Sequence, residues 1–505
     1  MNRNRLWRTG FWATSGILLC AAGYRGTQMR GWVDAGSAIA APADQPDAAA
    51  NVQRADELAA KKDFVGAIAI YREVLQTSPD LVTARQKLAG ALSAADRPLE
   101  AVVEYTQILR LHPEDANIRY DRARALFRGG KASEAIAELN EVVRANPDLR
   151  SARADLGIMY MKTERIMEAA SLYGDAIRLW PKDAAVYNDY GVVLMRLDDQ
   201  AAALGNFQQA VLLNPRHIDA QYNLGLLLMN QWQLDRAIVH LTAALDLNPK
   251  YADAHYNLGR TLLRQGKTEQ ALISFRKVLD LNAPSAELFY NVGMGLARLG
   301  REKEAIARFS EALRQDPNLA EAHYELGKAM LRFGNVALAI PQFRAVIKQH
   351  PADVDAIRQL AVALNHTGKV DEAIVRYKDA LNIRPDYTEA MNGLAWILAT
   401  TPDAEYRDPT AALKLAQSVS DQGIRQTPMQ LDTLATAQAA AGQYALAVKT
   451  EQAAIASAGV LKNPDFQKEL EARLKLFQEG HPYIEVVKPT TRPTTTTTTT
   501  APAAP

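Results

Sequence analysis

The sequence holds a single cysteine, Cys20, among its 505 residues. One cysteine cannot form a disulfide within the chain, and it excludes any zinc or iron–sulfur site built from several cysteines. No run reaches the roughly 18 consecutive apolar residues of a convincing membrane span, which excludes a protein that crosses the bilayer many times. The charges almost balance, because the sequence has 58 lysines and arginines and 57 aspartates and glutamates. This balance argues against a dedicated nucleic-acid binder. A large folded protein without disulfides remains.

The first residues are typical of an export signal. Arg3, Arg5 and Arg8 precede a mostly apolar run at residues 11–24, with the sequence FWATSGILLCAAGY. A basic start before an apolar segment of this length is the arrangement of a secretory signal. Residues 1–30 are therefore expected to form a signal peptide or an N-terminal anchor. We expect an exported protein, periplasmic or anchored in the inner membrane; the alternative is a cytoplasmic protein.

Two segments have compositions that cannot build a core. Residues 31–47, rich in alanine, aspartate and proline, are expected to be a flexible linker. Residues 488–505 contain seven consecutive threonines between prolines and are expected to be a disordered tail. Cys20 follows Leu19, where a lipid-attachment motif needs a small residue, so an ordinary cysteine is favoured over a lipidated one.

A proline recurs at a constant spacing of thirty-four positions along most of the chain. It fills nine of ten successive places, which we call the proline slots: Pro79, Pro113, Pro147, Pro181, Pro215, Pro249, Pro317, Pro351 and Pro385. The remaining slot is Ala283, followed by Pro284. Alanine stands twelve positions before every slot, a large apolar residue stands eight before, and a small residue stands twenty-four before. The pattern predicts ten regular repeats over residues 48–387.

Each repeat contains two stretches with apolar residues at helical spacing, for example Tyr222, Leu224 and Leu228 in a first stretch. Between the two stretches, glycine recurs at one position of the repeat, as Gly130, Gly266, Gly300, Gly334 and Gly368. Glycine suits the left-handed conformation that ends a helix. No single helix pair can bury its apolar face alone, so neighbouring pairs must stack. The prediction is an all-α fold, a solenoid of stacked helix–turn–helix repeats.

This pattern resembles the tetratricopeptide repeat, a helix–turn–helix unit of the same length with small, alanine, aromatic and proline positions at the same places. The segment AVYNDYGVVLMRLDDQAAALGNFQQAVLLNP at residues 185–215 carries nearly all of them. The resemblance implies a right-handed superhelical solenoid whose concave groove, lined by the first helices, binds other proteins. The run LAWILATTPDAEYRDPTAALKLA at residues 394–416 resembles the closing repeats of many bacterial members, which favours a bacterial source.

Beyond residue 387 the repeat continues in altered form. Residues 388–460 are expected to hold two divergent repeats, because the segment at 400–409 lengthens the turn within the first of them. Residues 461–487 are expected to form a terminal helix whose polar outer face caps the solenoid.

The sequence contains no motif that indicates an enzyme. The segment GRTLLRQGKT at 259–268 ends like a phosphate-binding loop, but six residues separate Gly259 from Gly266 where that motif needs four. His255 and His323 lie two repeats apart and cannot share a metal ion. Since almost all of the chain is assigned to helical repeats, we predict no catalytic residue, no metal site, no cofactor and no enzymatic activity.

Two rows of first-helix residues are candidates for partner binding. The first row comprises Tyr222, Tyr256, Tyr290 and Tyr324, each twenty-seven positions before a slot, and Asn223, Asn257 and Asn291, which follow the first three of them. Tyrosine offers a large contact area with a polar tip, and asparagine can pair with both backbone groups of an extended peptide. The asparagines resemble the ladder of the tetratricopeptide superhelix in protein O-GlcNAc transferases. The alternative is that the tyrosines only pack between repeats.

The second row is acidic. Asp253, Glu287 and Glu321 each stand thirty positions before a slot, as Asp219, Asp355 and Glu389 also do. Such a row could favour a basic partner. The alternative is that each carboxylate stabilises the first turn of its own helix through the helix dipole, by ~0.3–1 kcal/mol. The acids also argue against the basic clamp with which chaperone-binding members grip a C-terminal carboxylate.

These observations predict a non-enzymatic scaffold that binds a protein or peptide in the concave groove, in the bacterial cell envelope. A recruiting or substrate-presenting subunit of a glycosyltransferase, or of another enzyme acting in trans, is the alternative. Nucleic acid is not an expected partner. Membrane contact is expected only through the N-terminal segment if it is not cleaved.

Overall fold

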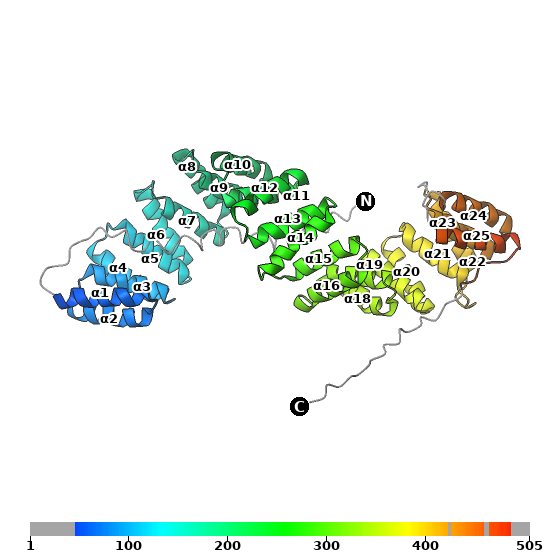
Figure 1. Ribbon diagram of the computed structural model, residues 1–505, viewed down its shortest axis with the longest axis horizontal. Helices are drawn as coiled ribbons and strands as arrows, with labels where there is room; N and C mark the ends of the chain where they lie inside the picture. The colour runs from blue at the N-terminus through cyan, green and yellow to red at the C-terminus, as the bar shows by residue number, and fades with distance from the viewer. Residues whose placement is uncertain (1–45, 423–425, 459–463, 486–505) are drawn as a thin grey trace, which may run out of the picture. The chain divides into compact units, whose positions relative to one another are not determined.

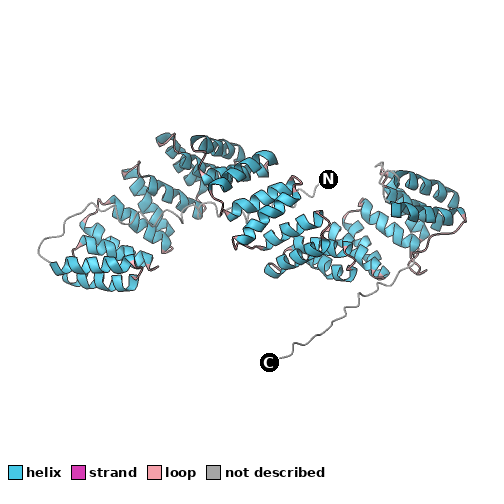
Figure 2. Cartoon of the chain, viewed as in Figure 1, coloured by secondary structure: helices cyan, strands magenta, loops and turns pink. Residues whose placement is uncertain are grey.

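The computed structural model describes residues 46–422, 426–458 and 464–485, and within these ranges it contains 25 helices and no strand (Figure 2). The expected signal or anchor, most of the linker and the threonine-rich tail lie outside the described residues. None of the described helices combines the length and the apolar character that crossing a bilayer requires. The all-α prediction is confirmed for the described residues.

The chain divides into two compact units, residues 1–261 and 262–505, and each is described by itself. The first unit holds α1 (Pro46–Ala60), α2 (Phe64–Thr77), α3 (Val82–Ala94), α4 (Pro98–Leu111), α5 (Ala116–Arg128), α6 (Ala132–Ala145), α7 (Arg150–Lys162), α8 (Ile166–Leu179), α9 (Ala184–Arg196), α10 (Gln200–Leu213), α11 (Ile218–Asn230) and α12 (Leu234–Leu247). The boundary between the units falls within α13 (Ala252–Arg264).

The second unit holds α14 (Thr268–Asp280), α15 (Ala286–Arg298), α16 (Glu302–Gln315), α17 (Ala320–Arg332), α18 (Val336–Gln349), α19 (Val354–His366), α20 (Val370–Ile383), α21 (Thr388–Thr400), α22 (Pro409–Asp421), α23 (Pro428–Ala440), α24 (Tyr444–Ala458) and α25 (Pro464–Gln478). Odd-numbered helices from α1 to α23 are the first helices of the repeats, and even-numbered helices are the second helices. Within each unit, helices that follow one another in the chain pack side by side (Figure 1).

The repeating residues of the sequence are the packing residues of the fold. All ten alanines that stand twelve positions before a slot are 0% exposed: Ala67, Ala101, Ala135, Ala169, Ala203, Ala237, Ala271, Ala305, Ala339 and Ala373. The small residue of the first helix faces the large residue of the second helix, sixteen positions later. A Cβ atom added to Gly293 would lie 2.6 Å from the ring of Phe309, and one added to Gly191 would lie 2.6 Å from the ring of Phe207. The two helices of a pair therefore touch where the first has no side chain.

The turn inside each repeat has one residue with a positive φ. These residues recur once per repeat and have φ between 59° and 86°: Lys62, Asp96, Gly130, Glu164, Asp198, Trp232, Gly266, Gly300, Gly334 and Gly368. The glycines that the sequence singled out thus adopt the left-handed conformation expected of them. Five other repeats place a residue with a side chain in the same conformation, which costs L-residues roughly 1–2 kcal/mol.

The repeat that lacks its proline ends differently from the others. α14 has 13 residues, whereas the neighbouring second helix α16 has 14. After α14, Asn282 turns to a φ of 54°, and the Ala283 amide donates to the Val278 carbonyl at 3.2 Å. Because of this turn, α14 ends three positions before its slot, whereas α16 ends two positions before its own slot. Pro284, one place after the slot, then precedes the Ser285 N-cap of α15.

The last helix lies against the preceding pair and covers its apolar residues. Leu470 and Phe477 of α25 are buried against α23 and α24, while Lys468 and Glu471 face solvent. The segment after α25 returns to α21, where the Glu485 amide donates to the Thr400 carbonyl at 2.8 Å. A helix with one apolar and one polar face is what the end of a solenoid requires.

Candidate partner-binding surface

Three residues of the predicted tyrosine and asparagine row are buried. Tyr222 and Asn223 of α11 are each only 4% exposed, and Asn257 of α13 is 8% exposed. The Tyr222 ring lies 4.8 Å from the ring of Tyr251, and its hydroxyl accepts a hydrogen bond from the Asn257 amide at 3.0 Å. In this structure the packing alternative therefore describes Tyr222, while contact of the asparagines with a partner stays a prediction. The physical reason for the burial is the close approach of successive first helices.

The asparagines bind the protein itself rather than forming a free ladder. Asn257 donates to the Tyr222 hydroxyl and also to the Asp253 carbonyl at 2.9 Å. Asn223 donates to the side-chain oxygen of Asn188 at 2.9 Å. Asn291 donates to the Glu287 carbonyl at 2.8 Å, one turn back on its own helix. Each amide thus has a donor engaged within the protein, and reading of a peptide backbone by these asparagines stays a prediction.

The other three tyrosines are half-buried. Tyr290 packs on Phe309 with a centroid distance of 6.0 Å, and Tyr324 packs on Phe343 at the same distance. The guanidinium of Arg260 lies 5.5 Å from the centre of the Tyr256 ring. These tyrosines both pack and present surface, so their contact with a partner remains a prediction that the structure does not test.

The predicted acidic row lies at the surface. Asp253, Glu287 and Glu321 are exposed in the first turns of α13, α15 and α17. None of the three is an N-cap residue; Ser285, for instance, caps α15 by accepting from the Leu288 amide at 3.1 Å. Their position fits stabilisation by the helix dipole. A basic partner for this row stays a prediction.

The structure adds a set of acids that the sequence reasoning missed. Asp121, Asp155 and Asp189 each stand twenty-six positions before a slot, on α5, α7 and α9, and we call them the aspartate column. This is the same position in the repeat as that of the three asparagines. The signal was therefore present in the sequence, but we followed the amides and not the acids that continue the row. Burial raises the pKa of Asp121 to about 6 and that of Asp189 to about 7.

Hydrogen bonds join equivalent helices at a spacing one position longer than the repeat. The Tyr120 hydroxyl donates to Asp155 at 2.7 Å across α5 and α7. The Asn223–Asn188 bond across α9 and α11 has the same spacing. Each bond links the place of the tyrosines in one repeat, which Asn188 occupies in its own repeat, with the place of the asparagines in the next. Consecutive first helices are thus tied together along the face that carries the aspartate column.

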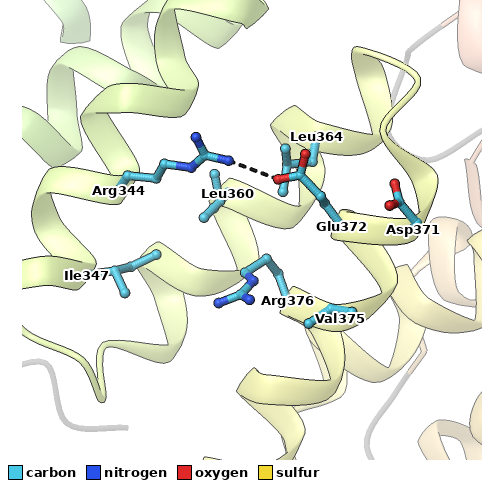
Figure 3. Close-up of a pocket in the computed structure, with 8 residues that line it drawn as sticks. All are labelled: Arg344, Ile347, Leu360, Leu364, Asp371, Glu372, Val375 and Arg376. Carbon is cyan, nitrogen blue, oxygen red and sulfur yellow. Dashed lines mark hydrogen bonds and ion pairs between the residues drawn. The ribbon is translucent and has the colours of Figure 1, made fainter.

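The second helices border a separate hollow of about 420 Å³ in the unit 262–505 (Figure 3). Leu360 and Leu364 of α19 line it together with charged residues of α18 and α20. Arg344 donates to Glu372 at 2.9 Å, and Arg376 pairs with Asp379 at 2.9 Å. These charges neutralise one another, so the hollow offers little specific chemistry to a ligand. Among the described residues, no group of three or more histidines, cysteines or acids is placed to hold a metal ion.

The stacked helix pairs, with their invariant buried alanine, define a repeat scaffold of the α-solenoid class. Models described as tetratricopeptide repeat match residues 92–156, 155–215, 222–287 and 324–387, and one described as TPR repeat matches residues 296–334. Together these matches cover more than half of the chain. The chain belongs to the tetratricopeptide-repeat proteins.

Several solved structures are similar to the chain. One is YrrB, described as a TPR protein with an unusual peptide-binding site, with 27% identity over 37% of this chain and 95% of that one, at a TM-score of 0.34. PilW, described as a type IV pilus biogenesis factor, has 22% identity over 41% and 97%, at a TM-score of 0.38. Yeast Tom70 has 16% identity over 86% and 96%, at a TM-score of 0.33. No curated protein sequence matched the chain.

Proposed function

We propose that the protein is a non-enzymatic scaffold that binds a partner protein, or an extended segment of one, on the face formed by its first helices. The proposal is supported by a difference in burial between two sets of residues in the repeat. The alanine and aromatic residues of the helix pair are buried in the contacts between helices, whereas Tyr256, Tyr290 and Tyr324 of the first helices remain partly exposed. Tyrosine is favoured in interfaces because it buries much area at small entropy cost.

Site-specific photocrosslinking in cells tests this proposal. A photoreactive phenylalanine derivative at position 256 or 324 should capture the partner, because these side chains lie on the first helices. The matched controls are positions 273 and 375, where Ile273 and Val375 are exposed on second helices. Equal capture at both sets of positions, or no protein captured at any of them, would contradict the proposed face. Stoichiometric capture of a catalytic polypeptide would favour the recruiting-subunit alternative.

We further propose that the scaffold works in the cell envelope. The support is the basic start and the apolar run at residues 11–24. A phosphatase that is active only outside the cytoplasm, fused after Ala50, should be active in cells. An inactive but intact fusion would show that the segment does not export the chain, and the scaffold would then act in the cytoplasm.

A further inference from the structure

The first helices of the unit 1–261 carry five aspartates that the surrounding protein holds partly out of water. Three are the aspartate column, and the other two, Asp219 and Asp253, lie in the first turns of α11 and α13. Burial raises the pKa of all five carboxyls. A carboxylate in such a place is destabilised when ionised unless a cation or hydrogen-bond donors compensate it.

For Asp121 and Asp155, the protein itself provides groups that stabilise the ionised carboxylates. Asp155 accepts a hydrogen bond from the Tyr120 hydroxyl at 2.7 Å, and the Arg124 guanidinium lies 3.4 Å from the same oxygen. Arg124 also acts on Asp121 through its charge. One arginine thus serves two carboxylates of the column.

The other three aspartates have no such arginine among the described residues. Asp189 accepts hydrogen bonds from the neighbouring Asn188 amide at 3.2 Å and from the Tyr173 hydroxyl, and the charges that act on it include those of Asp183 and Asp219, which are of the same sign. Within the described part of the unit, no lysine or arginine forms an ion pair with Asp189, Asp219 or Asp253. Hydrogen-bond donors reach Asp189 and the charge of His217 acts on Asp219, but no lysine or arginine ion pair neutralises these carboxylates in the described part of the unit.

A second, independent observation concerns a neutral side chain at the same place. Asn223 is 4% exposed, and its amide donates to Asn188, the residue that also donates to Asp189. Its own carbonyl oxygen, Oδ1, accepts no hydrogen bond within the protein. Asp219 lies one helical turn before it on the same face of α11. A buried acceptor without a donor is destabilising, and a donor brought by a ligand removes that cost.

We infer that the acidic face, which we define as the aspartate column together with Asp219, Asp253 and Asn223, binds an extended segment of a partner protein that carries several lysine or arginine side chains. The inference rests on the proposed scaffold function and specifies the chemistry of its partner. Ammonium and guanidinium groups bring both positive charge and N–H donors. Nucleic acids and anionic lipid surfaces are repelled by the same carboxylates.

The repeat geometry also fixes the spacing of the cations. Consecutive first helices touch, as the Asn223–Asn188 bond shows, so equivalent residues on them lie about 8–10 Å apart. A polyproline II segment has three residues per turn and rises ~3.1 Å per residue, so every third side chain lies on one face, roughly 9 Å from the last. A segment with a cation at every third position therefore matches consecutive first helices.

Binding of a labelled peptide made of Lys-Pro-Pro repeats to the full-length chain tests the inference, with fluorescence anisotropy as the measurement. We expect saturable binding that weakens with salt. Combining Asp155→Asn, Asp189→Asn and Asp219→Asn should weaken it by roughly tenfold or more, because asparagine keeps the shape and removes the charge. Far-UV circular dichroism checks that the helices are kept; if the triple variant unfolds, Asp219→Asn alone should weaken binding by a smaller factor.

The matched control removes the same charge elsewhere in the unit, with Glu73→Gln, Glu114→Gln and Asp246→Asn at exposed positions. This control should bind the peptide nearly as the wild type does. The inference is wrong if the control loses as much affinity as the test variant, if neither loses any, or if a Glu-Pro-Pro peptide binds equally well. A second peptide has the same number of lysines in one consecutive run. If it binds as tightly as the Lys-Pro-Pro peptide, the proposed spacing of one cation at every third position is wrong.

Two further outcomes separate this inference from the proposed function. Self-association of the wild-type chain that the triple variant abolishes would make a second copy the occupant and would overturn the inference. A partner captured at positions 256 and 324 that carries no basic segment would leave the scaffold function standing and overturn its assigned chemistry.

Discussion

At the scale of single residues, the repeat depends on a contact between a residue without a side chain and a ring. The added Cβ of Gly293 would lie 2.6 Å from Phe309, and that of Gly327 would lie 2.7 Å from Phe343. Since neighbouring carbon atoms pack at about 3.5–4.0 Å, either a ring or a helix must move to admit even a methyl group. In another repeat the same two positions hold Ala123 and Leu139, so that a larger residue on the first helix is matched by a smaller one on the second.

The first prediction uses this natural pair. Gly293→Ala should lower the free energy of unfolding by about 1–3 kcal/mol, because it overpacks α15 against α16. Phe309→Leu on its own should also destabilise, because it leaves a cavity. Combined, the two changes reproduce the Ala123–Leu139 pair and should cost less than the sum of the single changes. Urea unfolding of the four proteins measures the coupling; strictly additive losses would show that the two residues do not oppose each other.

The second prediction concerns the left-handed turn residue. Lys62→Gly should raise the free energy of unfolding by about 1 kcal/mol, because glycine adopts a positive φ without the cost that a side chain brings. Gly300→Ala should lower it by a similar amount. Nothing lies within 4 Å of the Cβ that this change would add, so its whole effect comes from the backbone. Thermal unfolding measures both, and a stabilising Gly300→Ala would contradict the argument.

The residue scale also shows where sequence reasoning reaches its limit. The glycines at the turn were predicted because glycine is the usual residue at a positive φ, but Trp232 in the same conformation carries no such signal. Tyr222 and Tyr256 occupy the same place in the repeat, yet one is buried and the other half-exposed. The difference depends on Tyr251, which stacks on Tyr222 and comes from the next repeat. A single repeat unit does not contain that information.

At the scale of elements, the most unusual packing joins the last helix to the pair before it. Arg473 of α25 is 5% exposed and donates to both carboxylate oxygens of Asp432 on α23, at 2.8 and 3.0 Å. The rings of Trp396 and Tyr483 flank its guanidinium at 5.5 and 5.3 Å. Glu451 of α24 is 0% exposed beside this pair, and burial together with the charge of Asp432 raises its pKa well above that of a free glutamate. The fold thus favours the protonated form of Glu451.

The third prediction follows from the sign of that shift. Because the pKa of Glu451 is higher in the folded protein than the ~4.3 of an unfolded glutamate, folding takes up protons over a pH range that begins near 4.3. The free energy of unfolding must then fall as the pH rises, by up to about 1.4 kcal/mol per pH unit from this group. Asp432, whose pKa burial also raises, acts in the same direction. Glu451→Gln should remove its part of the slope and stabilise α23–α25 at pH 8 more than at pH 5.

Urea unfolding at the two pH values measures this, followed by the fluorescence of Trp396 after the other five tryptophans are replaced by phenylalanine. Glu469→Gln is the matched control, because Glu469 is an exposed acid of α25 near Arg473. The control should keep the wild-type pH dependence. An unchanged slope in Glu451→Gln would mean that Glu451 is ionised in the fold.

The sequence predicted a terminal helix at residues 461–487, and α25 occupies Pro464–Gln478 within that range. The ion pair that fixes α25 was not predictable in the same way. Arg473 and Asp432 are far apart in the sequence, and their meeting depends on how α25 crosses α23. Amphipathic periodicity tells which face of a helix is buried, but not which residue of the neighbour lies opposite.

At the scale of the whole molecule, the order of packing is close to one-dimensional. Among the described helices, the substantial contacts join helices adjacent in the chain or next but one, such as α19 with α20 and α19 with α21. The period of the proline slots was sufficient to predict this architecture, because each repeat meets only its neighbours. The chemistry of the acidic face was not predicted, because it depends on how far the surrounding protein removes each aspartate from water.

The last prediction tests the one-dimensional order. Ala373 of α20 is 0% exposed, so Ala373→Leu should overpack its repeat at a local cost of about 1–3 kcal/mol. In such a solenoid the damage stays near its source, because stability is a sum of repeat and neighbour terms. Hydrogen exchange should therefore accelerate in α18–α21 and stay as in the wild type in α1–α6. Val375→Leu, at an exposed position of the same helix, is the control and should change neither region. Uniformly faster exchange across both units would instead show a single cooperative core, and the additive description of the repeats would then fail.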